Sequence, residues 1–194
     1  MAVSEATKDE SLLQQWLADE ARVRRLLADA REAGRNDGTA AAAPPSRSAL
    51  AALSGIEVFD AMMQGRLPGA PIAETLDFLL IHVEPGLAIF QGQPLLRHYN
   101  PLGTVHGGWY ATLLDSALGC AVHSNLPAGK AYTTLELKVN LVRALTENVP
   151  RVRAEGRVIH AGGQVATAEA RLVGPDGRLY AHATTTCLVF SPRT

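Results

Sequence analysis

The stretch from Trp109 to Val122, WYATLLDSALGCAV, constrains the fold more than any other part of the sequence. It has the length of a helix, and Asp115 is its only residue with a charged side chain at neutral pH. A helix that is apolar on nearly all sides has to be enclosed by other elements. We therefore expect a buried central helix from Trp109 to about Ser124.

The segments around this helix have the composition of strands. Two runs precede it and meet at Pro85-Gly86, and four runs rich in Val, Thr, Leu and Ile follow it. The predicted strands are 75–84, 87–93, 131–144, 150–160, 164–173 and 179–190. Connections this short favour an antiparallel meander, whereas a parallel α/β sheet would need a helix between most strands. The predicted fold class is α+β, with an antiparallel sheet wrapped around one central helix.

An additional helix and a linker are predicted at the N-terminus, over residues 1–47. Apolar side chains recur at helical intervals over 7–32, and Thr7 with Glu10 has the spacing of a capping box. Residues 33–47 contain glycines, an alanine run and a Pro-Pro pair, which is typical of a flexible linker.

The second predicted domain covers residues 48–194 and begins with a helix over 48–64, for which Ser48 is the expected cap. The amphipathic N-terminal helix needs a surface for its apolar stripe. We expect it to pack on its own domain or on a symmetry mate; a partner protein or a membrane surface is the alternative.

Composition and motif content argue against several classes of protein. The formal net charge is −1, without the basic excess of a nucleic-acid-binding protein. Cys120 and Cys187 are far apart, and the six histidines lack metal-ligand spacing, so we expect neither a disulfide nor a metal site. No apolar run reaches the ~20 residues of a membrane span, and the polar N-terminus differs from a signal peptide. These features predict a cytoplasmic protein without a nucleic-acid partner.

The lone carboxylate of Asp115 has two interpretations. A buried charge is costly unless it is hydrogen-bonded, faces a solvent-filled groove or serves chemistry. The helix begins at His106-Gly107-Gly108, and free amide N–H groups at a helix start suit a developing oxyanion. Glycine there also lets a ligand approach the backbone closely. Together, the acid and the double glycine favour an active site.

Spacing restricts how these groups can cooperate. Asp115 follows Gly107 by eight residues, which is about 12 Å along a helix. One substrate cannot contact both groups of the same helix. A two-fold dimer with antiparallel helices would bring Gly107 of one chain beside Asp115 of the other.

The segments YNPLGTVHGG (99–108) and LLDSALG (113–119) resemble the signature of PaaI-type hotdog-fold acyl-CoA thioesterases. This family includes hydroxybenzoyl-CoA thioesterases with an acid on the central helix. The segments AYTTLEL (131–137) and GPDG (174–177) are similar to the same pattern, and the resemblance covers roughly residues 48–190.

The resemblance implies roles for five residues on the helix and just before it. Asp115 would activate water or attack the thioester carbon, and the Gly107 N–H would polarise the carbonyl, with Gly108 beside it. Asn100 and His106 would orient the substrate and the helix start. Alternatively, Asn100 is a turn residue and His106 bonds a nearby carbonyl.

Further roles concern the attacking water and coenzyme A. The resemblance implies a water-holding hydroxyl on the strand after the helix, assigned to Thr133 with Thr134 as its neighbour; both also suit plain strand positions. The phosphates of coenzyme A need cations or free amides. The candidates are Gly162, Gly163, Arg143, Arg157 and Arg171.

The expected activity is hydrolysis of acyl-CoA or aryl-CoA thioesters by a homodimer or a dimer of dimers. Coenzyme A is then part of the substrate, and no other cofactor is expected. A hotdog enoyl-CoA hydratase or dehydratase using His106 and Asp115 is one alternative. A non-catalytic acyl-CoA-binding module, whose N-terminal helix serves a partner, is another.

Overall fold

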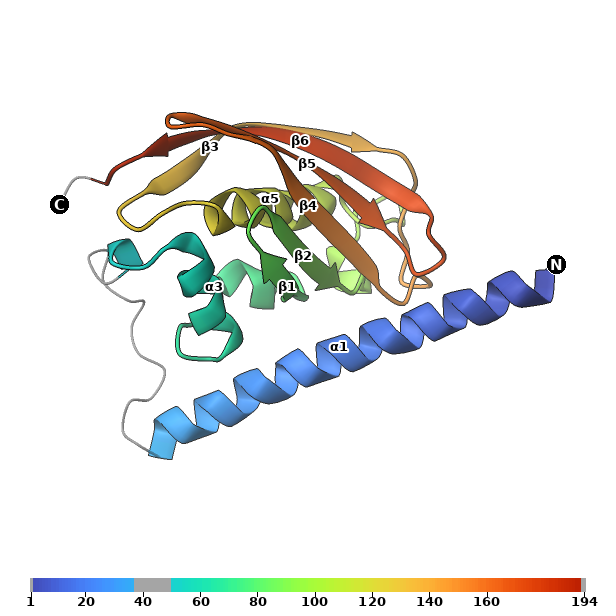
Figure 1. Cartoon of the computed structure of the whole chain (residues 1–194). Helices are drawn as coiled ribbons and strands as arrows, with labels where there is room; N and C mark the ends of the chain where they lie inside the picture. Colours follow the sequence, from blue (N-terminus) through green and yellow to red (C-terminus); the bar gives the residue numbers. More distant parts are fainter. Residues whose placement is uncertain (1, 37–49, 193–194) are drawn as a thin grey trace.

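The computed structural model describes residues 2–36 and 50–192 (Figure 1). In chain order the elements are α1 (Ala2–Asn36), α3 (Gly55–Met63), α4 (Pro71–Thr75), β1 (Phe78–Glu84), β2 (Leu87–Gly92), η1 (Leu96–His98), α5 (Gly107–Ser124), β3 (Ala131–Leu141), β4 (Val152–Ala161), β5 (Val165–Val173) and β6 (Leu179–Phe190). The six strand predictions and the central helix are confirmed, with shifted ends. The first strand starts three residues late because Pro71, which suits the first turn of a helix, begins α4.

The six strands form one antiparallel sheet that curves over α5 (Figure 1). Leu113, Leu114 and Leu118 of α5 are fully buried beneath it. At Gly156 of β4 an added Cβ would lie 2.3 Å from the Ala117 carbonyl oxygen, so only glycine permits this close approach of strand and helix. The expected enclosure of the central helix by the sheet is confirmed.

The strand order is β1-β2-β4-β5-β6-β3, which is only partly a meander. The pairs β1–β2, β4–β5 and β5–β6 are sequential hairpins, as expected. However, β3 pairs with β6 at the far edge, and β4 returns to β2. The expected antiparallel pairing is confirmed, but the meander is interrupted at β3, because the sheet has to cover α5 from β1 on one side to β3 on the other.

The helix predicted over 48–64 is interrupted. Residues 50–51 are helical, residues 52–54 are not, and α3 starts after Ser54; Ser48 lies outside the described residues. The Glu57 carboxylate accepts hydrogen bonds from the Ser54 N–H at 2.7 Å and from the Ser54 hydroxyl at 2.6 Å. These bonds lower the pKa of Glu57. The S-x-x-E signal of a helix start was present in the sequence at this position.

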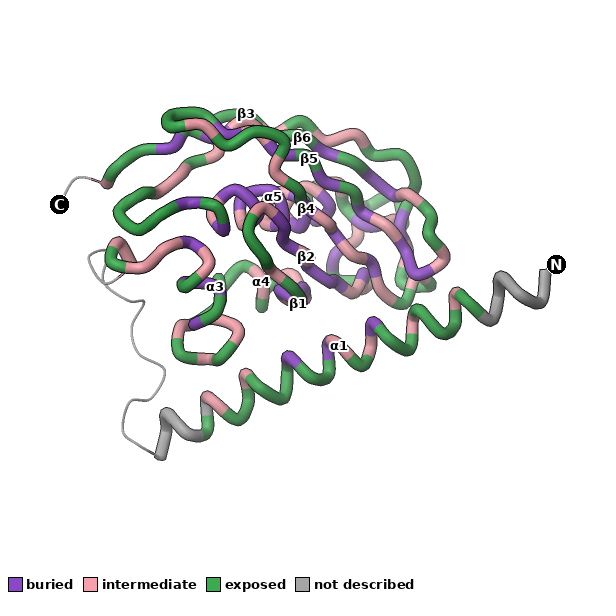
Figure 2. The backbone as a smooth tube through the Cα atoms, viewed as in Figure 1, coloured by how far each residue is buried: buried purple, intermediate pink, exposed green. Residues whose placement is uncertain are grey.

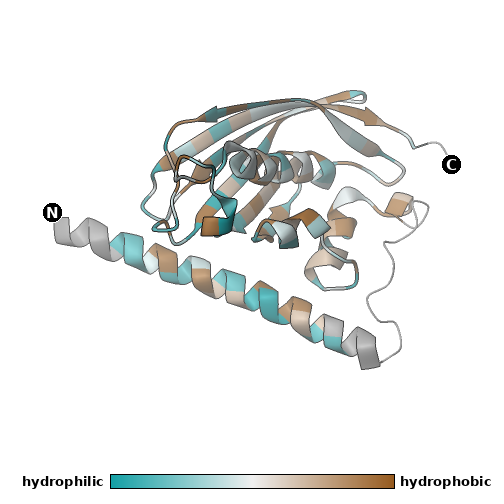
Figure 3. Ribbon diagram, turned by 180° about the vertical axis from the view of Figure 1, so that it is seen from behind, coloured by the Kyte–Doolittle hydropathy of each residue, from teal (hydrophilic) through white to brown (hydrophobic). Residues whose placement is uncertain are grey.

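Helix α1 packs on its own chain, which was one of the two expectations. It spans Ala2–Asn36, so Thr7 lies inside the helix and is not its cap. Trp16, Glu20 and Val23 face the domain and are buried (Figure 2). Hydrophilic and hydrophobic residues alternate along the helix (Figure 3), which agrees with burial of a single face.

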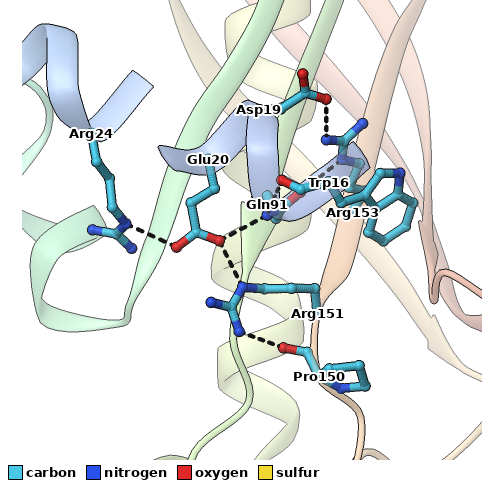
Figure 4. A network of polar contacts seen from close by, with 8 residues as sticks. All are labelled: Trp16, Asp19, Glu20, Arg24, Gln91, Pro150, Arg151 and Arg153. Carbon is cyan, nitrogen blue, oxygen red and sulfur yellow. Dashed lines mark hydrogen bonds and ion pairs between the residues drawn. The ribbon is translucent and has the colours of Figure 1, made fainter. Parts of the chain in front are cut away.

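A polar network around Glu20 holds α1 in place (Figure 4). The Glu20 carboxylate accepts hydrogen bonds from Arg151 Nε at 2.6 Å, Gln91 Nε2 at 2.8 Å and Arg24 Nε at 2.8 Å. Burial would raise the pKa of Glu20, but these three donors outweigh it and lower the pKa. An ionised Glu20 therefore stabilises the docked helix.

Two further contacts flank this network along α1. Asp19 pairs with Arg153 at 2.8 Å, and the Arg153 guanidinium lies 4.6 Å from the ring centroid of Trp16 (Figure 4). Towards the C-terminal end of α1, a Cβ at Gly65 would come within 2.1 Å of the Ala30 Cβ. Contacts on both sides of its middle turns thus fix the position of α1.

Glu20→Ala should loosen α1 while the sheet stays folded. The substitution leaves Arg151 and Gln91 without their acceptor, which costs about 2 kcal/mol, or roughly thirtyfold in the docking equilibrium. Hydrogen exchange by mass spectrometry measures this as faster exchange confined to α1. Glu10→Ala, at an exposed position of the same helix, is the control. Equal exchange in the two variants would contradict the role of the network.

Acid should loosen α1 in the wild-type protein. The pKa of Glu20 lies below its ordinary value of 4.5. Its stabilisation is therefore complete above pH 4.5 and is lost as the pH falls through the lowered pKa. Hydrogen exchange of α1 measured between about pH 6 and pH 3 should accelerate in the wild type and stay nearly constant in Glu20→Ala, after correction for the intrinsic rate.

Candidate active site

Asp115 lies on α5 and lines a cavity of about 260 Å³. The walls of this cavity are mainly apolar and come from α1, α3, β1, β2 and β3; they include Val23, Leu27, Met63, Leu80, Phe90 and Tyr132. The carboxylate is half-buried, because the other sides of α5 are covered by the sheet. A single acid on an apolar cavity wall is the arrangement that the sequence predicted for a reactive group.

The environment of Asp115 favours a reactive carboxylate. Burial raises its pKa, and a hydrogen bond of 3.3 Å from Thr134 Oγ1 to Asp115 Oδ1 partly opposes the rise. A carboxylate with few hydrogen-bond donors is a stronger base and a stronger nucleophile than a fully solvated one.

Cys120 lines the same cavity. Burial, with a further contribution from Asp115, raises the pKa of its thiol to about 12. The thiol is therefore neutral near pH 7 and unsuited to nucleophilic attack. Of these two side chains, Asp115 is the candidate for a reactive group.

The hydroxyl beside Asp115 belongs to Thr134. Successive side chains of a strand point to opposite faces, so Thr134 faces α5, whereas Thr133 is exposed on the other face of β3. Thr134, named in the sequence as the neighbour of Thr133, is therefore the threonine that contacts Asp115, and Thr133 does not face it. The alternation of strand side chains did not settle the choice in advance, because it does not say which face of β3 meets α5.

The start of α5 presents a free amide. His106 is the N-cap, and its Nδ1 accepts a hydrogen bond of 2.9 Å from the Gly108 N–H. Within the described residues, the Gly107 N–H donates to no acceptor. The expected role of His106 in ordering the helix start is confirmed. Because the Gly108 N–H is already used, Gly107 is the amide that remains for an oxyanion.

Asn100 shapes the loop before α5. Its Oδ1 accepts from the Leu102 N–H at 2.8 Å, and its Nδ2 donates to Thr104 Oγ1 at 3.1 Å. This is the turn function considered for Asn100 in the sequence. Asn100 and Gly107 line one hollow of about 280 Å³, together with Arg143.

His98 supports the same helix start, although it was not among the residues predicted from the sequence. Its carbonyl accepts a hydrogen bond of 2.7 Å from the His106 N–H, and its ring stacks on Trp109 with 5.4 Å between centroids. Its Nε2 lies 3.0 Å from Asp77 Oδ2. No local motif marks His98, since its partner Asp77 is twenty-one residues away in the chain.

Asp115 and Gly107 lie in different hollows of one chain. The residues that line the Asp115 cavity and those that line the Gly107 hollow have no member in common. The two positions are eight residues apart on a continuous α-helix, or about 12 Å. The separation inferred from the sequence is confirmed for a single chain.

The candidate phosphate contacts do not converge. Arg143 donates its backbone N–H to Tyr180 at one end of β6, whereas the Gly162-Gly163 turn lies beside Val189 at the other, about 30 Å away. In addition, the Gly162 N–H is used within the turn. One chain therefore cannot present both groups to one phosphate. The other two candidates, Arg157 and Arg171, lie on the exposed outer face of the sheet.

Comparison with known proteins identifies the family. Residues 102–181 match the model of the thioesterase superfamily. The chain is 35% identical over 108 residues to a Halobacterium salinarum protein that is provisionally named an esterase. The matched region covers 52% of this chain and 70% of that protein. The chain belongs to the thioesterase superfamily, and its fold is the hotdog fold.

Solved structures agree with this assignment. A phenylacetic acid degradation-related protein of Ralstonia eutropha, provisionally named a thioesterase, is 28% identical, with a TM-score of 0.62 over 67% of this chain and 98% of that chain. A mutant form of the phenylacetic acid degradation protein PaaI of Thermus thermophilus is also 28% identical, with a TM-score of 0.55 over 61% and 98% of the two chains. Membership of this superfamily supports thioester hydrolysis in general terms.

Within residues 2–36 and 50–192, no helix is both long and apolar enough to cross a membrane. The same part of the chain contains no group of three His, Cys, Asp or Glu side chains that could hold a metal ion.

Thr134→Val should move the pH dependence of activity. Removing a hydrogen bond to the carboxylate raises the pKa of Asp115 further, so the acid limb of the kcat/KM profile should shift to higher pH. Thr133→Val is the matched control on the opposite face of β3. An acid limb that shifts equally in both variants would disprove a specific effect of Thr134 on Asp115.

Proposed function

We propose that this protein hydrolyses acyl-CoA or aryl-CoA thioesters to the free acid and coenzyme A. The observation that carries the proposal is the half-buried carboxylate of Asp115 on the wall of an apolar cavity, beside the hydroxyl of Thr134. The cavity suits an apolar acyl group, and the carboxylate suits attack on the thioester carbon bound next to it.

The chemistry requires an attacking oxygen and a stabilised oxyanion. Asp115 accepts a proton from water while the water oxygen bonds to the thioester carbon; the carbon–sulfur bond then breaks, and the thiolate of coenzyme A takes up that proton. Alternatively, an Asp115 oxygen attacks the carbon and the carbon–sulfur bond breaks to release the thiolate; water then hydrolyses the resulting anhydride and supplies the proton that the thiolate takes up. A free backbone N–H such as that of Gly107 stabilises the negative charge on the carbonyl oxygen.

The proposed active unit is a two-fold dimer. In one chain Gly107 and Asp115 line separate hollows, so a site that uses both needs two chains. Strand β3 is an edge of the sheet, and Leu135 and Leu141 on it are 61% and 54% exposed. A long apolar sheet edge of this kind is suited to pairing with a second copy.

The hydratase alternative fits the geometry less well. A hydratase of this fold would need His106 and Asp115 at one substrate, but the His106 ring caps its own helix. A binding module without chemistry would not need the carboxylate in the cavity, where it costs stability.

Asp115→Asn should abolish most of the thioesterase activity without unfolding the protein. The substitution keeps the shape and removes the charge, and the expected loss in kcat is at least about a hundredfold. Thiol release from a panel of acyl-CoAs, followed with a chromogenic thiol reagent, measures it. Asp60→Asn, at an exposed acid of α3, is the control. If no thioester in the panel is cleaved by the wild type, the proposed function is wrong.

A mixed dimer tests whether the site is shared. Gly107→Pro removes the N–H, and proline suits the first position of a helix; His106 already has the extended backbone that proline requires before it. Gly107→Ala is the control that keeps the N–H. A heterodimer of Gly107→Pro and Asp115→Asn chains retains one intact site, so it should show about half of the wild-type activity per dimer. An inactive heterodimer would contradict a shared site.

A further inference from the structure

Helix α1 forms one wall of the cavity that contains Asp115. Val23 and Leu27 of α1 line this cavity opposite residues of β1, β2 and α5. Val23 is fully buried, and Leu27 is half-buried. The family match covers residues 102–181 only, so this wall lies outside the matched segment.

The position of these two side chains is fixed from both sides. On the N-terminal side, Glu20 is held by Arg151 at 2.6 Å (Figure 4). On the C-terminal side, Ala30 packs on Gly65, where the space is too small for any Cβ and φ is +71°. Val23 and Leu27 lie between these contacts on one helix, so they form a rigid wall.

A second hollow, next to the Asp115 cavity and distinct from the Gly107 hollow, lies beyond this wall, between α1 and the segment around α4. Its volume is about 840 Å³. Both hollows are lined by Leu27, Ala70, Ala73 and Phe78, so they are neighbours. The second hollow differs in its polar lining, which includes Arg24, Glu32, Glu74 and Asp77. Leu27 is the residue of α1 that lines both the Asp115 cavity and the second hollow, so its side chain separates the two on the α1 side.

The volume of the inner cavity limits its occupant. An apolar cavity of about 150 Å³ is sufficient for a benzene molecule. About 260 Å³ therefore accepts an aromatic ring with a short arm, or an aliphatic chain of medium length. A longer chain would have to pass Leu27 and enter the polar hollow, which is unfavourable for methylene groups.

We infer that α1 selects the acyl group: Val23 and Leu27 form the far wall of the acyl pocket, and Leu27 sets the greatest length that it accepts. The preferred substrates are arylacyl and medium-chain acyl thioesters. This inference rests on the proposed hydrolysis at Asp115.

The test compares chain-length profiles of full-length variants. The substrates are hexanoyl-, octanoyl-, dodecanoyl-, hexadecanoyl- and phenylacetyl-CoA, and kcat/KM is measured for each. Leu27→Ala joins the two hollows and should raise the hexadecanoyl-to-octanoyl ratio about tenfold, whereas Leu27→Phe should lower the dodecanoyl-to-hexanoyl ratio by a similar factor. The control is Leu26→Ala, which removes the same side chain from a position that is 45% exposed and lines neither hollow.

A second measurement separates this inference from the proposed function. Calorimetry with the free hexanoic to hexadecanoic acids reports on the pocket without any hydrolysis. If the wild type cleaves thioesters but the Leu27 variants keep its profile, the inference is overturned and the proposed function stands. If no thioester is cleaved, length-dependent binding that changes in Leu27→Ala and not in Leu26→Ala still supports the inference. Binding that is equal in all variants overturns it.

Discussion

The close contact between α5 and β4 governs the rest of this structure. The Ala117 carbonyl of the helix lies so near Gly156 that no side chain fits between them. The contact lets the sheet curve around the helix and bury Leu113, Leu114 and Leu118 completely, which contributes about 2 kcal/mol for each side chain. The strand order follows from the same requirement, since the sheet has to reach around the helix from β1 to β3.

Because the sheet covers most of α5, the candidate site lies on the remaining side of the helix. Asp115 is on that side, half-buried and with one hydroxyl donor, and the helix start presents the Gly107 amide in a separate hollow. A straight helix keeps these two groups apart. Their separation is therefore a property of secondary structure, and the proposed dimer is its consequence.

Helix α1 adds an element that the sheet and α5 do not need for their own packing. Its polar network is unusual, because ionised groups are partly buried where apolar packing would suffice. Such a network forms only when its donors and acceptors are placed accurately, so it fixes the position of α1 along the domain. A fixed position determines which α1 side chains face the Asp115 cavity, and this gives a reason for a charged contact there.

The sequence by itself determined the central helix, its lone acid, the six strands and the distance between Gly107 and Asp115. These depend on periodicity and on helix geometry, both of which are local. Only the tertiary structure decided that Thr134, and not Thr133, donates to Asp115, since a strand pattern does not say which face meets the helix. It also decided that β3 crosses to the far edge and that Leu27 reaches the cavity of Asp115. Contacts of this kind join segments distant in the chain, and no local pattern records them.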